Sequence, residues 1–394
     1  MKKFILIIFL FPILNLKSQI VEDHLVSKMD GTLLLDDLST YVNYWGFGQY
    51  IINSQNKPSF PGPLLTYKEN DSVHLWLHNL SPEDHTIHLH GLDVSQAYDG
   101  VPTTSFAVNS QDSTVYKFLC THPGTYLYHC HVLTTLHLSM GMYGMIVVHH
   151  AIPNLLYNNG PGFNKEYNYL FSDMYKQWNI NPTSPGEFYD FNADYFMVNG
   201  LSSYQLLEDS SQLIQYNQGD SIALRLANVA YSKIKLIFPL GCNPTIYMSD
   251  GRVLPNHFST DTLNIFPGER YSIILNPDPG MVDSIDVSYF KLTTNEHIGQ
   301  NFIGILEDQS FSNFQENENI SVPCIYPNPA NEQLTIKSNS EQNLIIIDIN
   351  GKIIANKKLI NGINKLNTSS LNKGAYMLYF VEERKTNKLI INQK

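Results

Sequence analysis

The sequence predicts an all-β protein of two Greek-key β-sandwiches followed by a third, small β-sandwich. Short runs of residues alternate between apolar and polar in period two, as half-buried strands do. Aromatic residues are abundant, with 24 Tyr and 20 Phe, and 23 Gly and 20 Pro supply turns. The 394 residues suffice for two or three domains. With 43% hydrophobic and 15% charged residues, the chain is not disordered, a coiled coil or a collagen-like repeat.

The first sandwich is expected over residues 20–150, where strands are predicted at 72–78, 113–119 and 144–148. The second is expected over residues 151–310 and repeats the same pattern, with strands predicted at 221–227, 233–238 and 271–275. Gly, Pro and Asn turn signals separate these runs in both segments.

A polar linker is predicted at residues 311–323, before a module over residues 324–394 with strands at 343–348 and 375–380. This module carries 10 basic and 5 acidic residues, whereas the whole chain has a formal net charge of −11. The contrast marks the C-terminal stretch as a separate unit. The acidic balance of the whole chain argues against nucleic acid as a partner.

The N-terminus has the features of a secretory signal peptide. Lys2 and Lys3 precede an apolar run at residues 4–14, and a polar stretch ends at Gln19. The apolar run is too short to span a bilayer, which takes roughly 20 residues, and no later segment reaches that length. We therefore predict that residues 1–19 direct export.

Histidines gather in the first predicted sandwich, because nine of the 14 lie between residues 74 and 137. Successive side chains on a strand face opposite ways, so His88 and His90 share one face. His129 and His131 do the same on a second strand. If the two strands pair, one side offers four imidazoles, a set that suits copper binding and reducing a small oxygen-containing molecule.

The opposite side of these strands offers a different set of side chains. Cys130 points away from its two flanking histidines, and His85, an odd number of positions from His88, faces away from that doublet. After a short loop, His137 and a methionine follow. Two histidines, a cysteine and a weak axial methionine are the ligands of a blue-copper electron-transfer site. The backbone at Cys130 would join the two sites covalently and give electrons a short route.

These residues lie among segments that resemble the cupredoxin domains of multicopper oxidases: Pro61-Gly-Pro63, Asp99-Gly-Val-Pro102, Gly124–His131 and Gly141–Val148, together with His85-x-x-His88-x-His90-Gly. The resemblance implies a type 1 copper bound by His85 and Cys130. It further implies that His88 is a type 2 ligand and that the type 3 ligands are His90, His129 and His131.

The segment after His131 departs from the family pattern. Five residues separate His131 from His137, whereas family oxidases often have three before the next type 1 histidine. The four residues between His137 and Met142 match the histidine-to-methionine gap of copper nitrite reductases and some oxidases. We therefore predict His137 as the second type 1 histidine and Met142 as the axial ligand, with Met140 as the alternative.

The second sandwich resembles the middle cupredoxin domain of three-domain oxidases, which usually carries no copper. The similar segments are Val198-Asn-Gly200, Leu224–Asn228, Ser249-Asp-Gly251 and Pro267–Arg270. Residues 151–310 hold only two histidines, His257 and His297. A complete trinuclear cluster takes eight histidines in this family, and one chain here supplies four.

This shortfall predicts a homo-oligomer that completes the cluster. In the leading hypothesis, two copies of the first sandwich meet about a two-fold axis and share one cluster. In the rival arrangement, a trimer borrows His257 or His297 from a neighbouring second sandwich.

The sequence thus predicts a secreted copper-dependent oxidoreductase resembling multicopper oxidases. An electron donor, either a small molecule or a redox protein, docks near His85 and His137. Electrons then pass through type 1 copper at Cys130 to the histidine-bound cluster, where dioxygen is reduced. A copper-binding electron-transfer protein with only the type 1 site and a copper nitrite reductase are the alternatives.

Several other polar side chains receive a structural interpretation. His74 and His78 are expected on a half-exposed strand face, and His24 as an isolated histidine. Asp84 is interpreted as a solvated loop carboxylate. Asp99 is interpreted mainly as a turn former, with a proton-handling role near the cluster as the alternative.

The last module resembles the C-terminal sorting domain of type IX secretion cargo, on the segments Ile325–Ala330, Ile347–Lys352, Ser370–Tyr376 and Lys388–Ile391. The resemblance implies the type IX export machinery as a partner. It also implies passage through the periplasm and outer membrane to a secreted or cell-surface location. Whether Cys242 and Cys324 pair is left open by the sequence.

Overall fold

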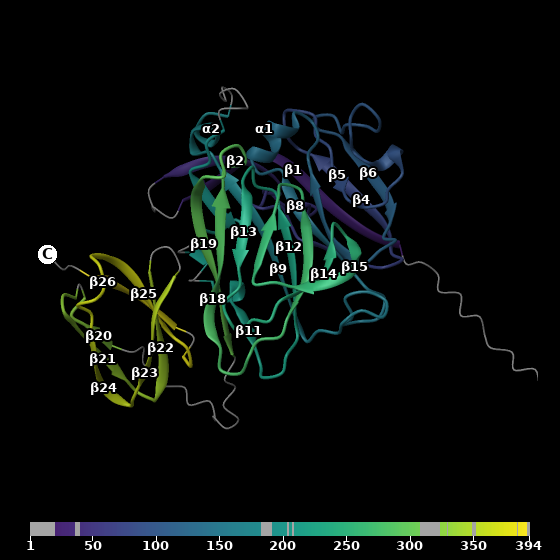
Figure 1. Ribbon diagram of the computed structural model, residues 1–394. Helices are drawn as coiled ribbons and strands as arrows, with labels where there is room; N and C mark the ends of the chain where they lie inside the picture. The colour runs from purple at the N-terminus through teal and green to yellow at the C-terminus, as the bar shows by residue number, and fades with distance from the viewer. Residues whose placement is uncertain are drawn as a thin grey trace, which may run out of the picture.

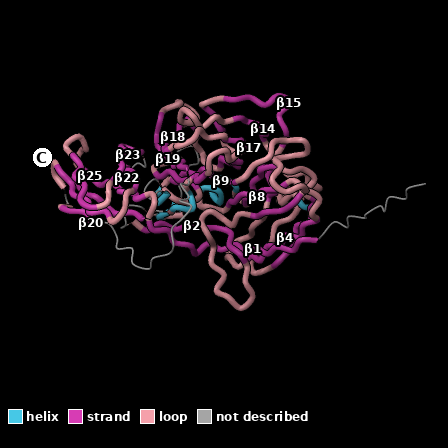
Figure 2. Tube along the Cα trace, turned by 90° about the horizontal axis from the view of Figure 1, so that it is seen from below, coloured by secondary structure: helices cyan, strands magenta, loops and turns pink. Residues whose placement is uncertain are grey.

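A computed structural model describes residues 20–35, 40–182, 191–202, 205–206, 209–307, 324–328, 330–348, 352–383 and 385–391. The predicted signal peptide at 1–19 and linker at 311–323 lie outside these residues. Strands form most of the regular structure of the described chain, joined by loops and a few short helices (Figures 1 and 2). Each run predicted as a strand is one, to within a residue at either end.

Two four-stranded sheets pack over the first hydrophobic core. One sheet has the order β2-β1-β4-β6, with bounds Tyr41–Gln49, Ile20–Leu34, Ser72–Asn79 and Ser113–Leu119. The other has the order β3-β8-β7-β5, with bounds Leu65–Lys68, Tyr143–His149, Gly124–His129 and His88–His90. Two short helices lie in the connections between these strands. The first, η1 at Gln96–Tyr98, lies between β5 and β6, and the second, α1 at Thr134–Ser139, lies between β7 and β8. Apolar side chains alternate inward along β4, where Val73, Leu75 and Leu77 are all buried.

A second pair of sheets forms the next core. The larger has the order β10-β9-β12-β17-β14-β15, with bounds Tyr195–Val198, Lys165–Met174, Ile222–Asn228, Arg270–Leu275, Thr245–Ser249 and Arg252–Ser259. The smaller has the order β11-β19-β18-β13-β16, with bounds Ile214–Tyr216, His297–Glu307, Val282–Phe290, Lys233–Ile237 and Thr262–Ile265. Two further short helices are α2 at Lys176–Ile180 and η3 at Ser210–Gln212.

The C-terminal module has its own small core between two sheets. Their orders are β20-β21-β24 and β23-β22-β25-β26, with bounds Cys324–Tyr326, Gln333–Ser338 and Gly362–Asn367, then Ile353–Leu359, Gln342–Asp348, Gly374–Phe380 and Lys385–Ile391. Ile345 and Ile347 of this module pack with Leu213 and Leu306 of the preceding one. Figure 1 shows the module beside the β11 end of the second sandwich.

The first two sandwiches join along β7, which contacts β12 and β17. Leu127 and Val147 pack with Leu170 and Ala227 in a shared apolar cluster. This contact matters for function because the end of β7 carries His129 and leads into Cys130.

The structure also bears on the cysteines. Cys120, Cys130 and Cys242 are free, buried thiols. The thiol of Cys242, whose pairing the sequence left open, is therefore not part of a disulfide.

Candidate metal centres

Three buried side chains come together beyond the end of β7. His85 precedes β5 and pairs through its backbone with Val108, Cys130 follows the last residue of β7, and His137 lies on α1. All three have no exposed surface. The sequence placed His137 beyond a loop, whereas the structure places it on a short helix that brings it back over Cys130.

The ligand atoms of this trio converge. The Sγ atom of Cys130 lies 3.6 Å from Nδ1 of His85 and 3.2 Å from Nδ1 of His137. Such separations suit a shared ion with ligand bonds of about 2.0–2.3 Å. Nε2 of His85 is buried without a hydrogen-bond partner. Glu83 Oε2 lies 3.5 Å from Nε2 of His137 but makes no hydrogen bond with it.

Both candidate axial methionines are fully buried in the same core as the trio. The Met142 backbone is bonded to both sides of the site, because its N–H donates to the His137 carbonyl and its carbonyl accepts from the Cys130 N–H. Met140 ends α1, and its carbonyl accepts from the Trp45 N–H. The choice between the two sulfur atoms stays a prediction.

Burial prepares the trio for a metal. Burial lowers the pKa of His85 to about 3, with the His137 ring as a second cause. Burial likewise lowers the pKa of His137 to about 4. Both imidazoles are therefore neutral at pH 7 and can offer a lone pair. Burial raises the pKa of the Cys130 thiol, so the thiolate forms as a cation binds.

The four paired histidines form a second group on the other side of Cys130. In the antiparallel pair of β5 and β7, His88 stands directly opposite His129. The ring centroid of His88 lies 5.0 Å from that of His129, 5.3 Å from that of His131 and 5.7 Å from that of His90. Ligand atoms of His88, His90 and His129 lie within 4.8 Å of one another. The predicted grouping of doublets is confirmed, while metal ligation stays a prediction.

Hydrogen bonds orient two of these rings. His88 Nδ1 donates to the Asp99 carbonyl at 2.7 Å, and an Asp99 carboxylate oxygen lies 3.4 Å away. His129 Nδ1 donates to the Cys130 carbonyl at 3.0 Å. Because each Nδ1 carries the proton, each Nε2 has a lone pair free for a metal. Hydrogen bonds from outer-shell partners commonly fix the tautomer of metal-binding histidines in this way. Asp99 therefore contacts the candidate cluster and does more than form a turn.

Burial also keeps two rings of this group neutral at pH 7. It lowers the pKa of His129 to about 3, assisted by the neighbouring histidines. It lowers the pKa of His90 to about 4, with Arg270 as the next cause. His90 and His129 approach to 3.3 Å between Nδ1 and Nε2.

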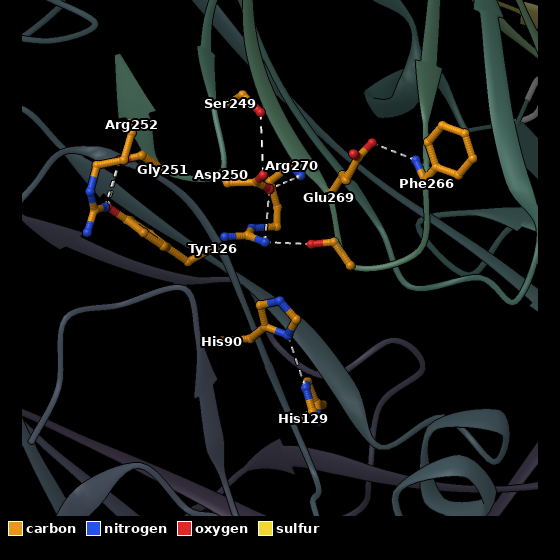
Figure 3. Close-up of polar contacts among 11 residues, drawn as sticks. His90, Tyr126, His129, Ser249, Asp250, Gly251, Arg252, Phe266, Glu269 and Arg270 are labelled. Atoms are coloured by element: carbon orange, nitrogen blue, oxygen red, sulfur yellow. Dashed lines mark hydrogen bonds and ion pairs between the residues drawn. The ribbon is translucent and has the colours of Figure 1, made fainter. Parts of the chain in front are cut away.

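Residues of the second sandwich, among them Arg270, lie beside His90 (Figure 3). A Cβ added to Gly268 would lie 3.4 Å from the His90 ring, at van der Waals contact. Buried Arg270 donates to the Gly268 carbonyl and pairs with Asp250 at 3.0 Å. Gly91 has a φ of +90°, and a side chain there would meet the Arg270 guanidinium. Sequence reasoning used Pro267–Arg270 only as a family marker and did not place it at the site.

The histidines of the second sandwich lie elsewhere. His257 is exposed and stacks on Tyr247 at 4.9 Å, and His297 is exposed against Phe290. Within the described residues, neither belongs to a group of three or more side chains able to hold a metal. Two such groups occur in that part of the chain, and both are in the first sandwich.

Comparisons with known proteins agree with this donor set. Residues 49–152 and 165–296 match family models described as multicopper oxidase. The chain belongs to the multicopper oxidase family. Copper is the metal of this family, and the His₂Cys trio and the imidazole group fit the donors that copper prefers. Residues 324–392 match the secretion system C-terminal sorting domain, which indicates a secreted or cell-surface protein.

Two curated relatives match this chain over part of their length. Copper resistance protein A of Escherichia coli is 27% identical over 262 residues, covering 55% of this chain and 42% of the relative. L-ascorbate oxidase of Brassica rapa subsp. pekinensis is 26% identical over 246 residues, covering 56% and 42%. The chain thus spans less than half the length of these relatives.

Solved structures match a larger share of the chain. The blue copper oxidase of Nitrosomonas europaea is 27% identical with a TM-score of 0.59, covering 74% of this chain and 89% of that one. Copper nitrite reductase of the same organism, at 19% identity and a TM-score of 0.58, covers 74% and 95% and shows the shared fold alone. Among the described residues, no helix is long and apolar enough to span a membrane.

Proposed function

We propose that this chain is an exported copper-dependent oxidoreductase that carries electrons from a donor to dioxygen. The observation that supports this most directly is the position of Cys130. Its thiol belongs to the trio with His85 and His137, while its backbone continues into His129 and His131 of the imidazole group. Copper bound at the trio would pass single electrons, and copper at the imidazoles would bind and reduce dioxygen.

The protein's own groups shorten the route between the two sites. His129 is the residue before Cys130, and its ring donates to the Cys130 carbonyl at 3.0 Å. The thiol and the ring are thus connected both through covalent bonds and through one hydrogen bond. His131 is held as well, because its backbone N–H donates to Thr86 Oγ1 at 2.7 Å.

The donor is proposed to dock over the trio, near His85 and His137. The trio itself is buried, so electrons must enter through the atoms that cover it. Leu133, the residue before α1, is 62% exposed, and Glu83 beside His137 is half exposed. These two side chains, one apolar and one acidic, suit docking of a small reductant or a redox protein.

A homo-oligomer is proposed to complete the cluster. The half-buried rings of His88 and His90 lie on β5, the edge strand of its sheet in the described residues, and half-buried His131 follows the neighbouring strand β7. A second copy related by a two-fold axis could present the same four rings at this edge. In the trimer, exposed His257 or His297 of a neighbour would do so instead.

An electron-transfer protein is the second candidate function. It is favoured by the fact that the trio is complete within one chain, whereas the imidazole group supplies half of the eight histidines. Nitrite reduction at a single copper would not need both histidine doublets. The fold likeness to a nitrite reductase carries no argument for that activity.

The deciding experiment measures copper per chain in mature protein whose oligomeric mass is known, together with visible and spin-resonance spectra. About two and a half coppers per chain in a dimer would support two type 1 sites sharing one cluster. One copper per chain with only a blue thiolate signature would establish the electron-transfer protein instead. Loss of cluster copper in His257→Gln or His297→Gln would select the trimer.

Export is proposed to begin with cleavage of residues 1–19 and to continue through the periplasm and the outer membrane. The domain limits proposed are 20–150, 151–310 and 324–394, with residues 311–323 as the linker. Detection of the mature N-terminus by mass spectrometry, in the medium or on the cell surface, tests this route.

A further inference from the structure

Leu133, the residue before α1, has an unusual backbone conformation. Its φ is 42° and its ψ is 51°, which is the left-handed helical region. That region is unfavourable for a bulky residue, because Cβ crowds the following carbonyl oxygen. Leu133 lies in the loop between His131 and His137, whose length departs from the family pattern. Strain of this kind persists only where the surrounding structure imposes it, and it gathers at functional sites.

Elsewhere the chain mostly places asparagine at such positions. Among the described residues, eleven non-glycine residues have a positive φ, and eight of them are asparagine. The other three are Gln111, Asp250 and Leu133. Asparagine and aspartate tolerate the left-handed region because their short polar side chains bond locally. Leu133 is the one apolar residue of this described set, so the backbone does not explain why the residue is leucine.

The side chain of Leu133 does not serve the fold either. It is 62% exposed, whereas its neighbours Val132 and Leu136 pack in the core of the first sandwich. It makes no capping hydrogen bond at a position where Ser, Thr, Asp and Asn are strongly preferred. A leucine that is neither buried, nor capping, nor suited to its backbone points to a contact with a molecule outside the chain.

The backbone of Leu133 is joined to the trio. Its carbonyl accepts from the N–H of Leu136 at 2.9 Å and from the N–H of His137 at 3.1 Å. These bonds start the helical turn that carries His137, whose Nδ1 lies 3.2 Å from Sγ of Cys130. A molecule that touches Leu133 is therefore connected to a trio ligand through one residue and one hydrogen bond. Electrons have a short route from that contact into the buried site.

We infer, on the basis of the proposed function, that Leu133 is a specificity-determining residue for the electron donor and favours a reductant with an apolar face. Contact with such a donor buries the exposed part of the leucine side chain, a hydrophobic gain that a hydrated ion does not provide. In the transfer the donor is oxidised by one electron and the metal ion held by the trio is reduced by one. Any proton that the oxidised donor releases goes to solvent.

The test compares two donors on the copper-loaded mature chain. Guaiacol has an apolar aromatic ring, and ferrocyanide is a hydrated anion without an apolar face. Leu133→Asn removes the apolar side chain but suits the left-handed backbone, so the blue band should stay. The ratio of kcat/KM for guaiacol to kcat/KM for ferrocyanide should fall about tenfold, mainly through the guaiacol KM, as loss of part of a leucine contact does. Leu133→Met, which keeps an unbranched apolar side chain, should keep the ratio.

Leu119→Asn is the matched control. Leu119 is 44% exposed on β6 and belongs to neither metal group. Its donor ratio should equal that of the unchanged protein. An unchanged ratio in Leu133→Asn would overturn the inference, and so would an equal fall in Leu119→Asn.

A binding measurement separates this inference from the proposed function. Saturation-transfer NMR on the metal-free chain should show contact with the guaiacol ring protons, lost in Leu133→Asn and kept in Leu119→Asn. If the copper-loaded protein shows no oxidase turnover, the proposed function fails, and the binding measurement still decides the role of Leu133. Equal saturation transfer in Leu133→Asn and the unchanged chain would overturn that role. The melting temperature of Leu133→Asn should be no lower than that of the unchanged chain, so lost binding would not reflect unfolding.

Discussion

The Sγ atom of Cys130 lies 3.2 Å from Nδ1 of His137, although seven positions separate the residues in the chain. Helix α1 turns the chain back, and Met142 closes the loop by bonding to the backbone of both residues. These backbone hydrogen bonds fix the positions of the two donor atoms, so the atoms need little rearrangement when a metal binds. Preorganised ligands of this kind keep the reorganisation of an electron-transfer site small.

Cys130→Ser should abolish the blue thiolate absorption and remove about one copper per chain, because a hydroxyl is a poor ligand for the trio. Copper at the imidazole group should remain, since His129 and His131 are unchanged. Visible spectra and metal analysis of the purified protein measure both effects. Cys120→Ser is the control, because Cys120 is also a free, buried thiol but belongs to neither metal group. An unchanged blue band in the Cys130 variant would remove the trio from the proposed function.

Acid should destabilise the metal-free protein from about pH 6.5 downward. His85, His129 and His137 are buried, with pKa values lowered to about 3, 3 and 4. The unfolded chain, with histidine pKa values near 6.5, takes up these protons first, so the stability is present above pH 6.5 and is lost as the pH falls. Each proton contributes a slope of about 1.4 kcal/mol per pH unit.

One buried carboxyl opposes this trend. Burial raises the pKa of Asp173 to about 6, so the folded state binds that proton more readily than the unfolded state does. A net loss of stability should nevertheless be seen by urea unfolding between pH 6.5 and pH 5, because three imidazoles outweigh one carboxyl. A flat profile across this range would contradict the burial of the three rings.

Arg270→Leu should lower the free energy of unfolding by about 2 kcal/mol, since it removes charged hydrogen bonds at a buried position. The Arg270 side chain is 5% exposed and holds Asp250 and the Gly268 carbonyl beside His90. Arg252→Leu is a matched control, because Arg252 pairs with Asp93 at 2.6 Å but is 43% exposed. That surface pair should contribute no more than about 1 kcal/mol. If both variants lowered the free energy of unfolding equally, the buried contacts of Arg270 would not stabilise the part of the second sandwich that lies beside His90.

The strands and the two histidine doublets could be predicted from the sequence because both follow from a period of two, whereas His137 was predicted from a family resemblance and lies on a helix. His88 with His90, and His129 with His131, share a face by spacing alone, and Cys130 must point the other way. The Greek-key pairing of distant segments is not encoded in that period. It places His24 beside His78, 54 positions away, and the second sandwich beside His90. These contacts depend on register between remote strands, so the histidine pair and Arg270 were not predicted.

Glu83→Gln should raise the reduction potential of copper bound at the trio by tens of millivolts. The Glu83 carboxylate lies 3.5 Å from Nε2 of His137, and its negative charge favours the more positive Cu(II) state. Asp84→Asn is the control, because the Asp84 carboxylate accepts from the Ser110 N–H in an exposed loop and should shift the potential less. Spectroelectrochemical titration of the blue band measures both variants at low and at 0.5 M salt. A lower potential in the Glu83 variant, or equal shifts in the two, would mean that Glu83 does not tune the site through His137.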